Sequence, residues 1–424
     1  MIASTAVRYT WLDPWLGVRD GPFRELCKAV GADLASHEKA MGCRLRRRRP
    51  IDQIHHEAAL ATVLANLAYA TLVPPVGGRL GLLTGNSDKG FSRYSNRAFG
   101  KPFRRLLHHL KQLRLIDLIS STERGQASSV APSDAFRSAL NPVAIDLSDF
   151  RRLEGEEVII LSRNTHQGAG RNRTVTREYV DYEETAATRG LRESIQRINR
   201  FLEAADIAFV DDGLGLVDPY QRRLTRHFVM REEDLEPCFD QGGRLFGGFW
   251  MNLKSSRRAA IRINGEPVGN LDFSSLFPRL AYASIGVSPP VSDLYAIPGL
   301  EGYRNEVKSV LNCLLFDHFR RRTWPEGIDG LPREWTVSRT KAAIVRHHPE
   351  LRGCLGQGLG LSFMYTESVI LVQVLHELID QGIVGLGLHD GLLVPRSKIE
   401  RTKMIMERVA HEVASVPLPV SIKA

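Results

Sequence analysis

One acidic residue, Asp272, lies inside the apolar stretch "VGNLDFSSLFPRLAYA" (residues 268–283), whose pattern predicts a buried strand. A lone buried carboxylate is costly to remove from water unless it is paired with a cation or binds a metal. A strand-end Asp that caps a following helix from Ser274 onward explains the same stretch. A second acidic position is needed to decide between a metal site and a helix cap.

That second position is Asp390, in "QGIVGLGLHDGLLVPRSK" (residues 381–398). The stretch predicts a strand, a turn and a strand, and Asp390-Gly391 is a hairpin signal that is equally compatible with a solvent-exposed Asp. If the two strands are neighbours, the carboxylates of Asp272 and Asp390 come together and repel each other unless cations lie between them. Two magnesium ions about 4 Å apart are the usual arrangement in nucleotidyl transfer, so the pair predicts that chemistry.

A cationic helix between the two strands would complete such a centre. The stretch "YRNEVKSVLNCLLFDHF" (residues 303–319) predicts this helix, because Arg304, Lys308 and Asn312 recur every four residues and share one face. Phe316, eight residues beyond Lys308, lies close to that face. Arg and Lys at this spacing are also common on helix surfaces, so the order of the three segments is what indicates triphosphate binding.

These three segments resemble the motifs of the family A DNA polymerases and the related phage-type single-subunit RNA polymerases. "LDFSSLFPRL" resembles motif A around Asp272, the cationic helix resembles motif B, and the His389-Asp390 turn resembles motif C. The stretch "MYTESVILVQVLHELIDQG" before that turn resembles the long palm helix of the family. Motif A also resembles that of the family B polymerases, but the "HD" form of motif C favours family A. The resemblance covers residues 240–398 and extends to a group of uncharacterised bacterial and mobile-element proteins.

The resemblance implies a role for each of these residues. The implied ligands of two magnesium ions, with manganese as a substitute, are Asp272, Asp390 and the backbone carbonyl of Phe273. The implied nucleotide-binding residues are Arg304, Lys308, Asn312, Phe316 and Phe277. Lys308 would also act as the acid for pyrophosphate, His389 would lie near the primer end, and Arg244 in "DQGGRLFGGFW" would contact the template–primer backbone.

The chain departs from the family A pattern at three positions. Gly391 stands where family A DNA polymerases have a Glu directly after the motif C Asp, which leaves two certain carboxylates. Phe277 replaces a Glu, and its ring would block a 2′-hydroxyl; Phe316 replaces a Tyr whose hydroxyl helps RNA polymerases hold ribose. Both aromatic residues therefore favour deoxynucleotides. The short segment between the motifs predicts small fingers at about residues 290–345.

The segment 51–150 predicts a separate nucleic-acid-binding domain. It contains an apolar helix, a polar loop (residues 83–90), a basic helix and a short strand pair around "LRLIDLISS", an order that resembles a winged helix. The basic helix of that fold would enter a groove and contact phosphates. The residues expected to do so are Arg97, Arg104 and Arg105. A helical domain with one basic exposed face explains the same pattern.

Composition agrees with a nucleic-acid partner. The chain of 424 residues has 57 Lys and Arg against 48 Asp and Glu, a net charge of +9, which favours an anionic partner. Five cysteines without a CxxC pair argue against a disulfide framework or a zinc knuckle and suit a reducing cytoplasm. No stretch approaches the roughly 20 apolar residues of a membrane span. We therefore expect a cytoplasmic protein without a membrane partner.

The stretch "DYEET" (residues 181–185) has the Asp-x-Glu form that begins polymerase proofreading exonucleases. The apolar positions from Leu191 to Leu202 predict a long helix that begins near Thr185. A helix cap at Thr185 is a sufficient explanation of the stretch.

Taken together, these patterns predict an α+β chain with a right-hand polymerase palm, short fingers and thumb-like helices, preceded by an α-helical winged-helix-like domain. The predicted segments are an N-terminal stretch with a basic run (1–50), the winged-helix-like domain and a connector (51–150), a thumb-like helical region (151–240) and the palm (241–424). The predicted activity is DNA synthesis from nucleoside triphosphates on a primed DNA template, in replication or repair of a bacterial or mobile element. Two alternatives remain: an RNA polymerase or primase of the same fold, and a DNA-binding replication initiator without catalysis.

Overall fold

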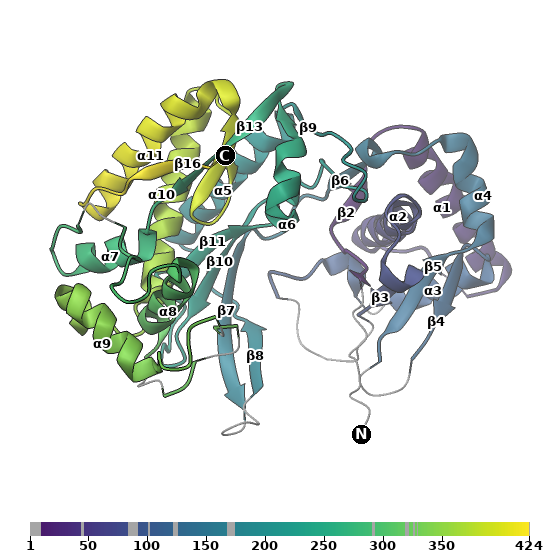
Figure 1. The fold of residues 1–424 in the computed structure, drawn as a ribbon. Coiled ribbons are helices and arrows are strands. Elements are labelled where there is room, and N and C mark those ends of the chain that lie inside the picture. Colours follow the sequence, from purple (N-terminus) through teal and green to yellow (C-terminus); the bar gives the residue numbers. More distant parts are fainter. Residues whose placement is uncertain are drawn as a thin grey trace. The chain divides into compact units, whose positions relative to one another are not determined.

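The computed structural model describes residues 10–43, 46–83, 92–100, 102–121, 126–167, 174–290, 293–318, 322–324, 327–328 and 330–423. The chain forms two compact units, Met1–Glu157 and Val158–Ala424. In Figure 1 the first unit is purple to blue and the second runs from teal to yellow. Helices and strands are both abundant, which confirms the predicted α+β class.

An apolar helix lies at the centre of the N-terminal unit (Figure 1). The helices of this unit are α1 (Pro22–Ala40), α2 (Pro50–Leu72), α3 (Pro102–Gln112) and α4 (Asp134–Leu140). The central helix, α2, starts with a proline, whose missing N–H costs nothing at that position, and is buried without interruption from Thr62 to Ala68. Both α1 and α3 contact it, and their Leu34 and Leu110 are fully buried in the shared core.

A four-stranded sheet in the order β1-β3-β5-β4 and a two-stranded sheet of β2 and β6 complete this unit. The strands are β1 (Thr10–Trp11), β2 (Leu16–Val18), β3 (Leu80–Leu82), β4 (Ile116–Ile119), β5 (Ser128–Pro132) and β6 (Phe150–Arg152). The predicted strand pair after the basic helix is present, since β4 follows α3 and pairs antiparallel with β5. On its other edge β5 pairs antiparallel with β3, which precedes α3.

Two further sheets form the framework of the C-terminal unit. One has the order β11-β10-β7-β8 and the other the order β14-β15-β13-β12-β9, with β16 added beside β13. The strands are β7 (Ile159–Gln167), β8 (Thr174–Tyr179), β9 (Ile207–Phe209), β10 (Thr225–Met230), β11 (Gly242–Phe246), β12 (Ile261–Ile263), β13 (Glu266–Phe273), β14 (Leu386–Gly387), β15 (Gly391–Pro395) and β16 (Val420–Lys423). Because β15, β12 and β16 all pair with β13, the strand that carries Asp272 is the centre of its sheet.

Helices pack around these sheets. They are α5 (Ala186–Ala204), α6 (Phe249–Asn252), α7 (Leu276–Ser284), α8 (Arg304–Phe316), α9 (Val337–His347), α10 (Gly360–Asp380) and α11 (Ile399–Ala414). The long helix predicted before the His389-Asp390 turn is α10, which contacts β11, α7, α8 and α11. Trp250 of α6 is fully buried, and its indole N–H donates a hydrogen bond to the carbonyl of Gly387 at 2.8 Å. Within the described part of the chain, no helix combines the length and the apolar character that crossing a membrane requires.

Some predicted segments differ from the structure. Residues 151–240 hold α5 but also β7 to β10, so the expectation of a helical region is wrong. The strand β10 alternates buried and partly buried residues with a period of two, a strand signal that is weak over six residues. The C-terminal part of the 51–150 segment, residues 121–150, is expected to be a connector but contains β5 and α4. Residues 1–50 contain α1, which belongs to the same unit as α2. The predicted loop at 83–90 lies almost entirely outside the described residues.

Candidate active site

Asp272 and Asp390 lie at the ends of two neighbouring strands. In the antiparallel register of β13 and β15, Asp272 is opposite Gly391. The N–H of Phe273 donates a hydrogen bond to the carbonyl of Asp390 at 3.0 Å. The strand pairing that the sequence predicts is therefore present, and both carboxylates extend from adjacent backbones.

Asp272 has the environment of a carboxylate that needs a cation. Its exposed fraction is 7%. Burial, and then the carboxylate of Asp390, raise the pKa of Asp272, whereas Lys423 and Lys308 lower it. The helix-cap alternative does not hold, because α7 begins at Leu276 without a side-chain cap. Two interacting carboxylates in a partly buried place favour a bound cation.

One cation is supplied by the chain itself. Lys423 of β16 forms an ion pair with Asp272 through its ammonium group. The neighbouring Ser421 donates from its hydroxyl to the backbone carbonyl of Asp272 at 3.1 Å. Sequence reasoning missed Lys423, since a single lysine in a four-residue strand carries no signal before the sheet pairing is known.

Gly391 is required by the close approach of β13 and β15. A Cβ atom at this position would lie 2.3 Å from the carbonyl oxygen of Leu271 and 3.2 Å from Oδ1 of Asp272. Real Cβ atoms do not approach a backbone oxygen this closely, so a Glu here would force the strands apart. The departure from the family A pattern at Gly391 thus has a steric cause.

Helix α8 presents the predicted cationic residues. Lys308 is exposed and acts on Asp272 electrostatically. Arg304 forms an ion pair with Asp293, with Nε 2.5 Å from Oδ2, and its guanidinium lies 5.3 Å from the ring centre of Tyr295. The Oδ1 atom of Asn312 is buried and accepts no hydrogen bond from a described residue. Such an unsatisfied acceptor is rare and suits a group that meets a ligand.

Phe277 and Phe316, the predicted sugar-selecting residues, are in contact. Their ring centroids are 5.7 Å apart, and Phe277 is 9% exposed. Phe316 also lies against the start of α10, where a Cβ at Gly360 would come within 2.2 Å of its ring. Phe277 of α7 and Phe316 of α8 therefore form one aromatic contact between the two helices.

Arg244 belongs to the same part of the unit, held by a buried carboxylate. Its Nε and Nη2 donate to the two oxygens of Glu367 at 2.6 and 3.1 Å. The guanidinium carbon lies 5.6 Å from the ring centre of Phe277. Burial raises the pKa of Glu367 to about 7, against the lowering effect of Arg244, and the carboxylates of Asp390 and Asp272 also raise it. Sequence reasoning missed Glu367, although a Glu within the apolar stretch of α10 is a usable signal.

His389 lies next to this group. Its ring centroid is 5.5 Å from that of Phe246, and its Nδ1 is buried without a partner among the described residues. Burial lowers the pKa of His389, and Arg244 lowers it further. A neutral imidazole is therefore favoured.

The other predicted contacts to nucleic acid lie in the N-terminal unit. Arg104 and Arg105 are exposed on α3, whose Leu106, Leu107 and Leu110 are buried. Arg97 is exposed on the short 3-10 helix before it. The basic face and the apolar stripe of α3 thus separate as the sequence predicts.

The carboxylate pair offers few metal ligands. Among the described residues no cluster of three or more His, Cys, Asp or Glu side chains is arranged to hold a metal ion. Glu367 is a further carboxylate within electrostatic reach of the pair, but both of its oxygens accept from Arg244. A metal at Asp272 and Asp390 would therefore need backbone, water or substrate oxygens as its remaining ligands.

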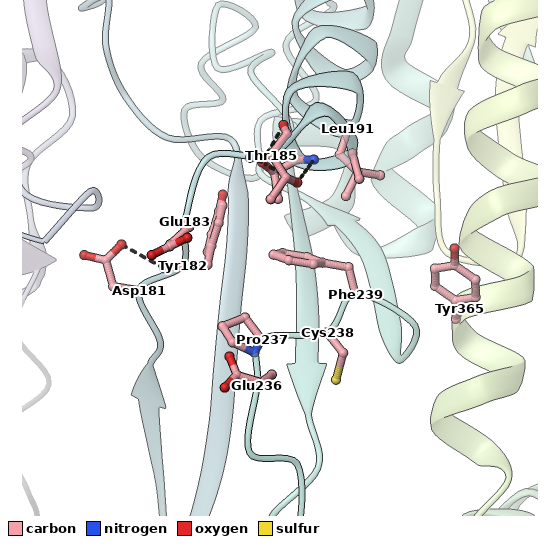
Figure 2. Close-up of a pocket in the computed structure, with 12 residues that line it drawn as sticks. Asp181, Tyr182, Glu183, Thr185, Leu191, Glu236, Pro237, Cys238, Phe239 and Tyr365 are labelled. Atoms are coloured by element: carbon pink, nitrogen blue, oxygen red, sulfur yellow. Dashed lines mark hydrogen bonds between the residues drawn. The ribbon is translucent and has the colours of Figure 1, made fainter.

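A cavity of about 940 Å³ lies elsewhere in the C-terminal unit, beside the start of α5 (Figure 2). Tyr182 and Phe239 meet edge to face in it, with ring centroids 4.9 Å apart, and acidic residues line it, but neither Asp272 nor Asp390 does. The hydroxyl of Thr185 accepts a hydrogen bond from the N–H of Thr188 at 3.2 Å, which is the predicted helix cap. The cap accounts for the "DYEET" stretch.

The chain matches no protein-family model and no curated protein. The resemblance to polymerases therefore rests on the motif residues of the sequence.

Glu367 gives a test of the buried ion pair through pH. The pKa of Glu367 is about 7 in the folded chain against an ordinary value of 4.5. Between pH 4.5 and about pH 7 the folded state therefore binds a proton at Glu367 that the unfolded state has largely lost. Stability then falls as pH rises through this window. From about pH 5 to about pH 8, wild type should lose about 1–3 kcal/mol of unfolding free energy relative to Glu367→Gln, which cannot titrate. Urea denaturation across this range measures the difference, and a constant difference would contradict the prediction.

Proposed function

We propose that the C-terminal unit is a nucleotidyltransferase that performs template-dependent DNA synthesis. The observation that carries the proposal is the pairing of β13 with β15, which brings Asp272 and Asp390 to one place, with Lys308 of α8 in electrostatic reach. Two carboxylates and a cationic helix are the parts that metal-assisted phosphoryl transfer requires. The competing functions, an RNA polymerase or primase and an initiator without catalysis, make different predictions in the assays below.

The residues present fit magnesium. Mg²⁺ is commonly bound through one or two carboxylates, substrate phosphates and several waters. Asp272 and Asp390 offer two carboxylates on adjacent strands, and the backbone carbonyl of Phe273 would add an oxygen. The same oxygen ligands accept manganese. When bound, the metal would favour deprotonation of the primer 3′-hydroxyl and neutralise charge on the triphosphate.

The residues of α8 would hold the triphosphate. Lys308 is exposed, and its positive charge acts on Asp272. Its ammonium group can therefore bind a phosphate and protonate the leaving pyrophosphate. Arg304 already holds an anion, Asp293, through two N–H groups, and it would exchange this carboxylate for a phosphate. Asn312, which is partly buried on the same helix, would contact the nucleotide next to Lys308.

Arg244 and His389 would hold the primer end. The side chain of Arg244 is 22% exposed although Glu367 fixes its orientation, so part of the guanidinium remains accessible. A guanidinium held in place binds an anion with less loss of side-chain entropy. His389 is only partly buried, so its ring can lie against the primer end.

The N-terminal unit would bind the DNA as a winged helix. Strand β3, the basic helix α3 and the β4–β5 hairpin follow one another in the order of that fold, with β5 between its two partners. Arg104 and Arg105 of α3, with Arg97 before them, would contact phosphates and position the duplex.

Primer extension tests the central proposal. With Mg²⁺ and deoxynucleoside triphosphates, wild type should extend a primer on a DNA template. Asp272→Asn and Asp390→Asn should each lower the rate by about 1,000-fold or more, because each removes a carboxylate from the metal site. The matched control Glu400→Gln, an exposed carboxylate on α11, should keep full activity. Duplex binding without any extension by wild type would instead favour the non-catalytic initiator.

Phe277 should set the choice of sugar. A ring under C2′ of the incoming nucleotide leaves no room for a 2′-hydroxyl, and losing such a clash is worth about 1–3 kcal/mol. Phe277→Ala should therefore raise ribonucleotide incorporation relative to deoxynucleotide by about 5- to 150-fold. Phe277→Tyr keeps the ring and should keep the preference. A wild-type preference for ribonucleotides would refute the sugar-selecting role of Phe277 and favour the RNA polymerase or primase.

The basic face of α3 should dominate non-specific DNA affinity. Arg104→Glu with Arg105→Glu should weaken binding to a duplex of any sequence and flatten its salt dependence by about one unit per lost phosphate contact. Fluorescence anisotropy at several salt concentrations measures both effects. Arg137→Glu, an exposed arginine on α4, is the matched control and should change neither. Unchanged affinity in the double variant would exclude α3 as the DNA-binding element.

A further inference from the structure

The two carboxylates of the pair are not equally engaged. Asp272 forms an ion pair with Lys423. Among the described residues, by contrast, no ion pair or side-chain hydrogen bond involves the carboxylate of Asp390. A cation thus already neutralises one carboxylate, and the other is left for a ligand.

The sheet holds Lys423 in this position. β16 pairs antiparallel with β13, so that Ser421 is opposite Asp272 and Lys423 is opposite Asn270. The strand is anchored from its other side, where Glu407 of α11 accepts from the N–H of Val420 at 3.2 Å. Because the backbone of β16 is fixed on both sides, the ammonium group reaches Asp272 without a large search of side-chain conformations.

Lys423 is also accessible, which a purely structural ion pair does not require. Its side chain is 52% exposed, while that of Asp272 is 10% exposed. The ammonium therefore lies at the solvent side of a buried carboxylate, where an ion or a phosphate would arrive. An ammonium in contact with a carboxylate oxygen occupies one of the two lone-pair positions of that oxygen, so it competes with a metal for the same ligand atom.

Charge counting leads to the same conclusion. The carboxylates of Asp272 and Asp390 carry two negative charges, and the ammonium group of Lys423 reduces the net charge of the group to −1. One divalent ion would make the group weakly positive, whereas two would place five positive charges, counting the ammonium, against two carboxylates. Lys308 adds a further positive charge within reach of Asp272. Like charges in a partly buried place repel strongly, so a second ion is disfavoured before substrate arrives.

We propose that Lys423 occupies one of the two cation positions at the Asp272–Asp390 pair, so that the free protein binds one divalent ion instead of two. The remaining ion would lie on Asp390 and the oxygen of Asp272 that Lys423 does not contact. This inference rests on the proposed function, because it assumes that the pair is a metal site. It assigns to the chain's own ammonium a charge that a second metal supplies in two-metal centres.

Counting bound Mn²⁺ tests the inference. Free Mn²⁺ gives an electron paramagnetic resonance signal that is lost on binding, so a titration of the full chain without nucleotide gives the number of sites. Wild type should bind one ion, and Lys423→Met should bind two. Lys423→Arg, which keeps the charge, should bind one. Lys398→Met removes an exposed lysine elsewhere in the unit and should also leave the number at one.

Further variants separate the two ways of failing. If wild type and Lys423→Met bind the same number of ions, with equal affinity, the role of Lys423 is refuted while the metal site stands. If neither binds Mn²⁺, the metal site itself is refuted, and with it the proposed function. Asp390→Asn should remove the single ion of wild type, and retention of that ion would place it elsewhere and overturn the inference. Circular dichroism of each variant checks that it is folded.

Discussion

The close approach of β13 and β15 at Gly391 is the constraint on which the site depends. No side chain fits there, because a Cβ would meet the carbonyl oxygen of Leu271. The approach brings Asp272 and Asp390 to the same strand end at the cost of placing like charges together, which raises the pKa of Asp272. The same steric requirement removes the position from which a third carboxylate would have extended.

Charge compensation explains much of what surrounds the pair. Lys423 neutralises Asp272 directly, and Lys308 does so from a distance. Glu367 would add a third negative charge, but Arg244 donates to both of its oxygens, and burial raises its pKa to about 7. The arrangement therefore brings two carboxylates together while it limits the total negative charge around them.

A chain of contacts links the cationic helix to this charge cluster. Gly360 allows Phe316 to lie against α10, Phe316 contacts Phe277, and the guanidinium of Arg244 lies over the ring of Phe277. Residues from α7, α8, α10 and β11 thus restrict one another. If Phe277 selects the sugar, its position is set by packing on both sides and not by its own rotamer preference alone.

The sequence by itself determined the elements whose pattern is long or has a turn signal: α5 with its cap at Thr185, α10, the apolar β13 and the turn at Asp390-Gly391. It also separated the basic and apolar faces of α3. It missed the strands within 151–240, since alternation over a few residues is a weak signal. Only the tertiary structure decided that Lys423 lies on Asp272 and Glu367 on Arg244. Ser421, the neighbour of Lys423, is 149 residues from Asp272, and Glu367 is 123 residues from Arg244, so pairing between distant elements, which local periodicity does not encode, brings these charges together.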